Sequence, residues 1–422
     1  MKTKQLVIYR NFKHQQLFDD MAALLAGEPA QNDSFVCANQ LIELASTYGF
    51  EGNLWHCFLA FCMANHENAY STACEIVGEV QGSLNDLAMQ DFKILKQLFD
   101  YEIRSLDREG TGIWNSMSSY RAANGNSKVF NKRIRDRIVK LAVSLEEAED
   151  EDVFKQVVTE FYREFGVGKF GLNKAFRLEE NLKDVNIEPI TNVEHVYLKD
   201  IIGYELQKKK LIENTEAFIK GKAANNALLY GDAGTGKSSC IKAILNEYYD
   251  QGLRIIEVYK HQFRMLSDVL EQVKDRNYKF IVYMDDLSFE DCESEYKYLK
   301  AIIEGGLGRK PKNVLIYATS NRRHLIREKF SDKRELQDEL HENDTVQEKL
   351  SLAARFGVSI YFGAPDKKQF QHIVKTLAEK YNVVMPEEDL LLEANRWELS
   401  HGGLSGRTAN QFITHLLGKM DL

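Results

Sequence analysis

The sequence predicts an α/β core, built on a parallel sheet with helices on both faces, between an all-helical N-terminal domain and a C-terminal helical lid. Three observations in its 422 residues predict this. Up to about residue 165, apolar residues recur at spacings of three and four, as in amphipathic helices. Short apolar runs then alternate with helix-like segments, which is typical of a parallel sheet, and the last sixty or so residues are helical again. We expect a helical domain at 1–180, a linker at 181–200, the core at 201–362 and the lid at 363–422.

The N-terminal domain is predicted from helical segments that short polar loops separate. FDDMAALLAG (18–27), NLWHCFLAFCMANH (53–66) and LAMQDFKILKQLFDYEIRSL (87–106) all place apolar residues three or four positions apart. QGSLN and REGTG read as loops between such segments. Nothing in this half points to a reaction, so we expect it to recognise a protein partner.

Charge gives no support for a nucleic-acid partner. The net charge is −8 and neither half of the chain is basic. One stretch, Lys128 to Lys140, is cationic and leaves nucleic-acid binding open, but we interpret it as one solvated helix before the acidic EEAEDED.

Composition also indicates the compartment. No apolar run is long enough to span a membrane, and the N-terminal LVIY is too short for a signal peptide. The six cysteines form no CxxC pair, which favours buried thiols in a reducing compartment over zinc ligation. We therefore expect a cytoplasmic protein without a membrane partner.

Residues 181–200 are predicted as a linker because they are extended in character, contain Pro189 and lack helical periodicity. Beyond them, buried strands are predicted at NNALLYGD (225–232), RIIEVYK (254–260), KFIVYMDDL (279–287) and NVLIYATSN (313–321). Each is a short apolar run bounded by polar residues. The lid is predicted from three helical segments near the C-terminus.

The strand at 225–232 leads into GDAGTGKS, which fits the phosphate-loop pattern G-x-x-x-x-G-K-[ST]. A loop that wraps phosphates aims its backbone N–H groups inward, which a Cβ would obstruct at the glycines. Lys237 should reach the β- and γ-phosphates of ATP, and the Ser238 hydroxyl should bind Mg²⁺. The expected phosphate contacts are Gly231, Asp232, Ala233, Gly234, Thr235, Gly236, Lys237, Ser238 and Ser239.

A second acidic site follows the strand KFIVYMDDL. Carboxyl ends of parallel strands meet at one edge of the sheet, so Asp285 should approach the phosphate loop and hold Mg²⁺ through water. We expect Asp286 to orient or deprotonate the attacking water, with Glu290 as a supporting or substitute carboxylate.

These motifs, in this order, resemble those of AAA+ ATPases, with a P-loop NTPase core. The resemblance implies that Gly203 and Tyr204 in DIIGYELQ line the adenine, and that Asn321 in YATSNRR is the polar sensor near the γ-phosphate. It implies an arginine finger at Arg355 in EKLSLAARFG, although a surface pairing with Glu348 or Glu342 is the alternative. It also implies a lid sensor at Arg407 in GLSGRTANQF.

A closer resemblance is to one bacterial AAA+ family catalogued as a domain of unknown function. NNALLYGDAGTGKSS, DDLSFE, LIYATSNRRHLI and EKLSLAARFG carry it, over about residues 165–412. Two features depart from the commonest AAA+ pattern. Asp286 stands where glutamate is usual, and no aromatic–glycine pair follows the second strand, so Tyr259 is interpreted as a strand residue and protein threading is not expected.

The resemblance implies a Mg²⁺-dependent ATPase that remodels or licenses a protein partner. It also implies a homo-oligomer, a ring or filament, with ATP at the subunit interfaces. The alternative is an ATP-binding switch or scaffold that hydrolyses slowly and acts with DNA or a protein complex. A P-loop kinase is disfavoured, because Arg355 and the helical lid suit hydrolysis better than a second substrate.

Overall fold

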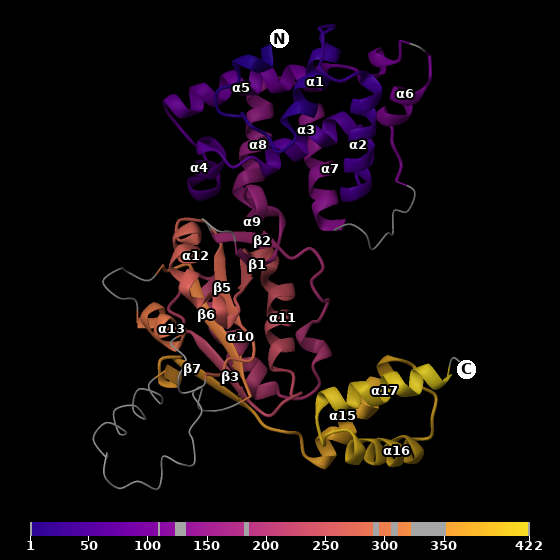
Figure 1. Cartoon of the computed structure of the whole chain (residues 1–422), viewed down its shortest axis with the longest axis vertical. Helices are drawn as coiled ribbons and strands as arrows, with labels where there is room; N and C mark the ends of the chain where they lie inside the picture. The colour runs from indigo at the N-terminus through magenta and orange to yellow at the C-terminus, as the bar shows by residue number, and fades with distance from the viewer. Residues whose placement is uncertain are drawn as a thin grey trace. The chain divides into compact units, whose positions relative to one another are not determined.

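The computed structural model describes residues 2–108, 110–122, 132–180, 185–289, 295–304, 311–321 and 352–420. The chain folds into two compact units, residues 1–173 and 174–422. The first is helical, and the second contains a sheet with helices and a C-terminal helical bundle (Figure 1).

The first unit is built around α3 (Leu54–Asn65), which is buried on every side from Leu54 to Ala64. It packs against its neighbours α2, α6 and α7. A helix that is apolar all round has to lie inside a bundle, because no face of it suits water. The other helices are η1 (Lys2–Gln5), α1 (Gln15–Leu25), α2 (Ser34–Tyr48), α4 (Ala69–Val77), α5 (Ser83–Asp100), η2 (Ile103–Leu106), α6 (Ile113–Ser118), α7 (Lys132–Glu146), α8 (Glu151–Phe165) and α9 (Gly168–Leu172).

Local sequence sets where several of these helices begin. Asp33 accepts hydrogen bonds from the backbone N–H groups that follow it and caps α2. Asn53 caps α3 and Asp150 caps α8 in the same way. Such caps satisfy backbone donors that have no partner inside the helix, and each stabilises its helix by about 1 kcal/mol.

The N-terminal segment is held by one buried carboxylate. Asp91 of α5 is fully buried. It accepts the backbone N–H groups of three successive residues, Val7 at 2.9 Å, Ile8 at 2.7 Å and Tyr9 at 2.9 Å. A buried charge requires such partners, because an unpaired one costs several kcal/mol.

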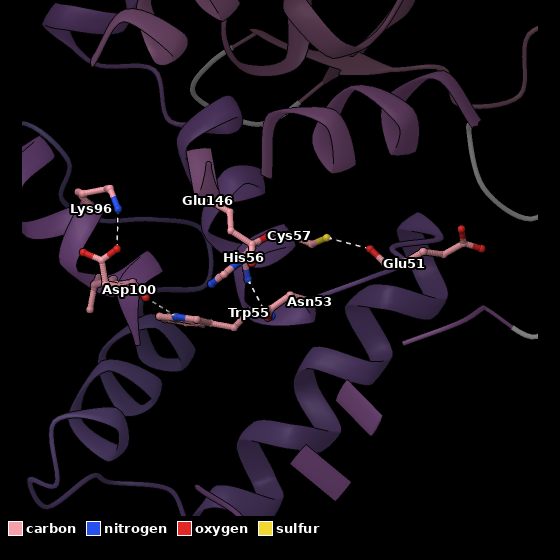
Figure 2. A network of polar contacts seen from close by, with 9 residues as sticks. Glu51, Asn53, Trp55, His56, Cys57, Lys96, Asp100 and Glu146 are labelled. Atoms are coloured by element: carbon pink, nitrogen blue, oxygen red, sulfur yellow. Dashed lines mark hydrogen bonds and ion pairs between the residues drawn. The ribbon is translucent and has the colours of Figure 1, made fainter. Parts of the chain in front are cut away.

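His56 of α3 is a second buried ionisable group in this unit, only 4% exposed. Its Nδ1 lies 3.4 Å from Oε2 of Glu146 (Figure 2). Its ring packs on Phe99 with centroids 4.9 Å apart. Burial lowers the pKa of His56, and the Glu146 carboxylate opposes this only in part. Beside it, the Trp55 indole donates to the carbonyl of Leu98 at 2.9 Å.

The second unit contains a sheet of seven strands among the described residues, in the order β2-β1-β4-β5-β6-β3-β7. All neighbouring strands are parallel except β1 and β2. β5 and β6 lie at its centre and are almost wholly buried. The strands are β1 (Ala175–Glu180), β2 (Val185–Pro189), β3 (Ala227–Gly231), β4 (Leu253–Glu257), β5 (Lys279–Met284), β6 (Val314–Ser320) and β7 (Val358–Phe362).

Helices cover both faces of the sheet, as the sequence predicts. Leu211 of α10 and Ile241 of α11 share a core with Leu229, Ile281 and other residues of one face. α12 and α13 lie on the opposite side from α11 (Figure 1). The helices of this layer are η3 (Leu198–Asp200), α10 (Glu205–Ile219), α11 (Lys237–Tyr248), η4 (Tyr249–Gln251), η5 (Lys260–Met265), α12 (Leu266–Val273) and α13 (Glu295–Glu304).

The lid contains α15 (Lys367–Lys380), α16 (Glu387–Ser400) and α17 (Gly406–Met420), which pack around a core of their own. Each helix contributes to this core, with Phe370 from α15, Leu390 from α16 and Phe412 from α17. No helix in the described ranges combines the length and the apolar character that crossing a bilayer requires.

The structure differs from the sequence-based division at residues 175–189. The prediction places them at the end of the helical domain and in the linker, whereas they form β1 and β2 and extend the sheet. Ala175 pairs with Ile255 of β4. β1 (AFRLEE) carries three charged residues among its six, and β2 (VNIEP) is a five-residue edge strand that ends at a proline, so neither has a continuous apolar run.

The buried imidazole makes stability of the first unit depend on pH. Because the folded pKa of His56 is lowered, the unfolded chain binds more protons below about pH 6.5, and the free energy of unfolding should fall as pH decreases from 7 to 5. We expect a shallower fall in a His56→Phe variant, which keeps a ring on Phe99 and does not titrate. Urea unfolding of the full chain, followed by tryptophan fluorescence at several pH values, tests this. Equal pH slopes in the two proteins would contradict it.

Candidate nucleotide-binding site

A cavity of about 940 Å³ lies within the second unit, between the carboxyl end of the sheet and the lid. Three parts of the chain line it: the segment before α10, the loop between β3 and α11 with the ends of β5 and β6, and the lid helices α15 and α17. The size suits a nucleotide, since ligand pockets commonly measure about 300–1,000 Å³.

The loop between β3 and α11 has the backbone that its glycines predict. Gly231, Gly234 and Gly236 all have positive φ, at 131°, 74° and 91°. A Cβ on Gly231 would lie 2.2 Å from the carbonyl oxygen of Phe362, so the close approach of β3 to β7 excludes every other residue there. The loop ends at the N-terminus of α11, where backbone N–H groups and the helix dipole favour a bound anion.

Lys237 points back into this loop. Its side chain is only 6% exposed. Its Nζ donates to the carbonyl oxygens of Gly231 at 3.0 Å and Asp232 at 2.6 Å, and to Oδ1 of Asn321 at 3.0 Å. Burial lowers the pKa of Lys237, while the carboxylates of Asp232, Asp286 and Asp285 oppose this. The ammonium is therefore directed toward the space that the loop encloses.

Asp285, which directly follows β5, accepts three hydroxyl hydrogen bonds at one oxygen. Its Oδ1 accepts from Ser238 at 2.7 Å, Tyr283 at 2.7 Å and Thr319 at 2.5 Å. Burial tends to raise the pKa of Asp285, but these hydrogen bonds outweigh it and the pKa is lowered. A carboxylate held in this way stays ionised near neutral pH.

Tyr283 and Thr319 are site residues that the sequence analysis missed. Tyr283 lies two residues before Asp285, on the same face of the strand. Met284 of β5 pairs with Ala318 of β6, and continuing this register places Asp285 opposite Thr319. The alternation of side chains along β5 and β6 indicates which residues share a face of the sheet. To find Tyr283 and Thr319 from it, one must also know that β5 and β6 are neighbours, which a single sequence does not reveal.

Asp286 has an unusual backbone conformation, with φ of 49°. Few residues other than glycine adopt this left-handed region. Its N–H donates to Thr319 Oγ1 at 2.9 Å, and its Oδ1 accepts from Asn321 Nδ2 at 2.8 Å. Asn321 thus bridges Lys237 and Asp286, so the predicted sensor, lysine and candidate base form one chain of contacts.

The donor set suits Mg²⁺. The Ser238 hydroxyl and the Asp285 carboxylate are hard oxygen groups in direct contact, and Mg²⁺ prefers one or two such ligands together with phosphate oxygens and water. Within the described ranges, no three histidine, cysteine or acidic residues gather in a way that could hold a metal by themselves.

The far end of the cavity is formed by the segment before α10. Gly203 and Tyr204 both have positive φ, at 80° and 60°, which turns the chain around the cavity. The buried Lys208 donates to the carbonyl of Ile201 at 2.8 Å and holds this segment in place. Tyr204 lines the cavity, and its hydroxyl donates to the carbonyl of Gly363 at 2.9 Å.

The lid contributes Arg407, near the start of α17. It lines the cavity, and its backbone N–H donates to the carbonyl of Gly234 at 3.2 Å. The predicted phosphate loop and the predicted lid sensor therefore meet within one unit.

The structure does not place two of the predicted catalytic residues in the cavity. Glu290 is outside the described residues. Arg355 precedes β7 and forms an ion pair with Glu304 of α13, and it does not line the cavity. The alternative partners, Glu348 and Glu342, also lie outside the described residues, and the finger role of Arg355 stays a prediction.

A family model described as "Protein of unknown function (DUF815)" matches residues 172–420 of the chain. The chain belongs to this family. The match confirms the family that the motifs predict and covers the whole α/β unit with its lid. It leaves the helical unit of this DUF815 protein almost entirely outside the matched residues.

Two comparisons with other proteins cover smaller parts of the DUF815 protein. It is 40% identical over 73 residues to the replication factor C large subunit of Staphylothermus marinus, which is 17% of this chain and 16% of that one. Two single-residue mutants of RuvB from Thermotoga maritima are 17% identical, with TM-scores of 0.34 and 0.36, over 50% of this chain and 62% of theirs.

The hydroxyl of Tyr283 should increase the affinity of the site for Mg²⁺. A Tyr283→Phe variant loses one of the three donors to Asp285, and changes of this kind around a metal ligand typically weaken metal affinity about tenfold or more. We expect about a tenfold rise in the Mg²⁺ concentration that half-saturates ATP-dependent phosphate release.

Tyr317→Phe is the matched control. It removes a buried tyrosine hydroxyl from the neighbouring strand, but its partners are Asn214 and Thr215. The control should leave the Mg²⁺ dependence unchanged. A similar shift in both variants would show that Tyr283 acts only through strand packing.

Proposed function

We propose that this DUF815 protein is a Mg²⁺-dependent AAA+ ATPase that binds and hydrolyses ATP to remodel or license a protein partner. The observation that carries the proposal is the set of contacts joining Lys237, Asn321, Asp286, Asp285 and Ser238 at the start of α11. They place a cation, a pair of oxygen groups of the kind that bind Mg²⁺ and the Asp286 carboxylate beside a phosphate loop.

Each group has a part in phosphate binding. The part of the loop that lines the cavity, Ala233 to Ser239, would hold the phosphates with backbone N–H groups, since the N–H of Asp232 already donates to Phe362. Lys237 would neutralise charge on the β- and γ-phosphates. Ser238 and Asp285 would hold Mg²⁺, which lowers the charge on the phosphates when bound. Gly203 and Tyr204 would lie along the adenine, and Arg407 would approach the phosphates from the lid.

Hydrolysis requires a water in line with the γ-phosphate. Asp286 is the best candidate to accept its proton, because it directly follows Asp285 and its Oδ1 is held by Asn321. Asn321 would orient both the base and the water. Glu290 remains in the proposal as a supporting carboxylate.

Arg355 supports a homo-oligomer with ATP at subunit interfaces. It lies outside the cavity of its own subunit, where an arginine finger supplied to a neighbouring subunit would be placed. The helical unit would then recognise the protein client. The five cysteines that the structure describes are buried free thiols, which supports a cytoplasmic setting.

A slowly hydrolysing switch is the second candidate. The observation that favours it is Asp286, whose side chain is one methylene shorter than the glutamate usual at this position. Such a protein would still bind ATP through the same loop and use the bound state to engage DNA or a protein complex.

Removing the lysine ammonium should weaken nucleotide binding. We expect Lys237→Ala to raise the Kd for ATP with Mg²⁺ by about 10- to 100-fold, the size of a lost charge-assisted hydrogen bond. Titration with a fluorescent ATP analogue measures it. Lys242→Ala, on the same helix and paired with Glu194, should stay within about twofold. If both variants and the wild type bind equally, the proposed function is wrong.

Turnover separates the two candidate functions. Phosphate release per subunit should rise with protein concentration, and Arg355→Ala should lower it by about 10³-fold without a matching change in Kd. Arg396→Ala, an exposed arginine of the lid, is the control. A wild type that binds ATP but releases hardly any phosphate at any concentration would favour the switch.

A further inference from the structure

We infer that Asp232 is a positioning residue whose carboxylate ties the phosphate loop to the first residues of the lid, so that nucleotide retention depends on it. This inference rests on the proposed function and deepens it. The phosphate-loop pattern leaves this position open to many residue types, so the loop itself does not explain an aspartate.

The side chain of Asp232 contacts the connection between core and lid. Its Oδ2 accepts the backbone N–H of Ala364 at 2.7 Å. Ala364 lies between the end of β7 at Phe362 and the start of α15 at Lys367. Asp232 is exposed, so this charge-assisted hydrogen bond adds little to the hydrophobic core and acts instead on the connection.

Two further contacts hold the same connection. The backbone N–H of Asp232 donates to the carbonyl of Phe362 at 2.9 Å. The hydroxyl of Tyr204 donates to the carbonyl of Gly363 at 2.9 Å. Three successive residues, 362 to 364, are thus held by the two segments that form the phosphate and base ends of the cavity.

The main chain of Asp232 also contacts the lysine of the phosphate loop. The carbonyl of Asp232 accepts from Lys237 Nζ at 2.6 Å and from Thr235 Oγ1 at 2.8 Å. A phosphate that draws Lys237 away from this carbonyl would alter the position of Asp232, and Ala364 would follow through the carboxylate. The loop also meets the lid at Gly234, where a Cβ would lie 2.9 Å from Ser405 Oγ.

The geometry therefore gives the lid two attachments to the phosphate loop. One joins Asp232 to Ala364 before α15, and the other joins Gly234 to the N–H of Arg407 in α17. With both attachments, the lid should stay closed over a bound nucleotide. Loss of the first should let it open more often and release the nucleotide faster.

The experiment compares Asp232→Ala with Asp232→Asn in the full chain. Alanine removes the acceptor for Ala364, whereas asparagine keeps an acceptor oxygen of the same reach. We expect Asp232→Ala to speed dissociation of a fluorescent ADP about tenfold in a chase experiment, and Asp232→Asn to stay within about threefold of the wild type. Asp389→Ala, an exposed aspartate of the lid, should change nothing.

Hydrogen exchange of the peptide that contains Ala364 is measured in parallel, with and without nucleotide. It should be faster in Asp232→Ala alone. Faster exchange with an unchanged rate of ADP dissociation would overturn the inference, as would an Asp232→Asn variant that loses ADP as fast as Asp232→Ala. A wild type that binds no nucleotide would overturn the proposed function and this inference with it.

Discussion

The hydrogen bonds to Oδ1 of Asp285 are the interaction on which the site depends. Their donors come from three elements: Ser238 from the start of α11, Tyr283 from β5 and Thr319 from β6. The contacts can form together only if β5 and β6 keep their register and β3 delivers α11 to the same edge. The parallel sheet therefore brings polar residues that are far apart in the sequence to the same edge.

Much of the α/β unit was predictable, because its signals are local. Each element has a sequence pattern that predicts it locally. These patterns are the glycines of the loop, the apolar runs of β3 to β6 and the polar residues at the ends of those strands. Asp285, Asp286 and Asn321 lie together because parallel strands end at one edge, a rule that needs no knowledge of strand order. β1 and β2 were missed because charged residues interrupt β1 and the edge strand β2 is short and ends at Pro189, so neither has a continuous apolar run.

Other features depend on contacts that one sequence does not reveal. The roles of Tyr283 and Thr319 follow from which strands are neighbours, and that of Asp232 from where the chain returns after β7. The left-handed backbone of Asp286 has only a weak sequence signal, since aspartate is enriched in this conformation but most aspartates do not adopt it. The function of the helical unit is likewise not revealed by the sequence. Its packing is well described, but no side-chain pattern in its described residues indicates what it binds.

The hydrogen bonds between Asp91 and the backbone of residues 7 to 9 have a practical consequence. Val7 to Tyr9 are bound through their main chain, and any residue except proline can offer an amide, so the exposed Val7 should tolerate substitution. Tyr9 should not, because its side chain is fully buried and its hydroxyl contacts that of Tyr162. Shortening the chain past these positions is different, since it would leave a negative charge in the middle of the bundle with nothing to solvate it. A trimmed start would therefore remove three donors from Asp91 and lower the stability of the helical unit, whereas an extension ahead of Val7 would keep all three.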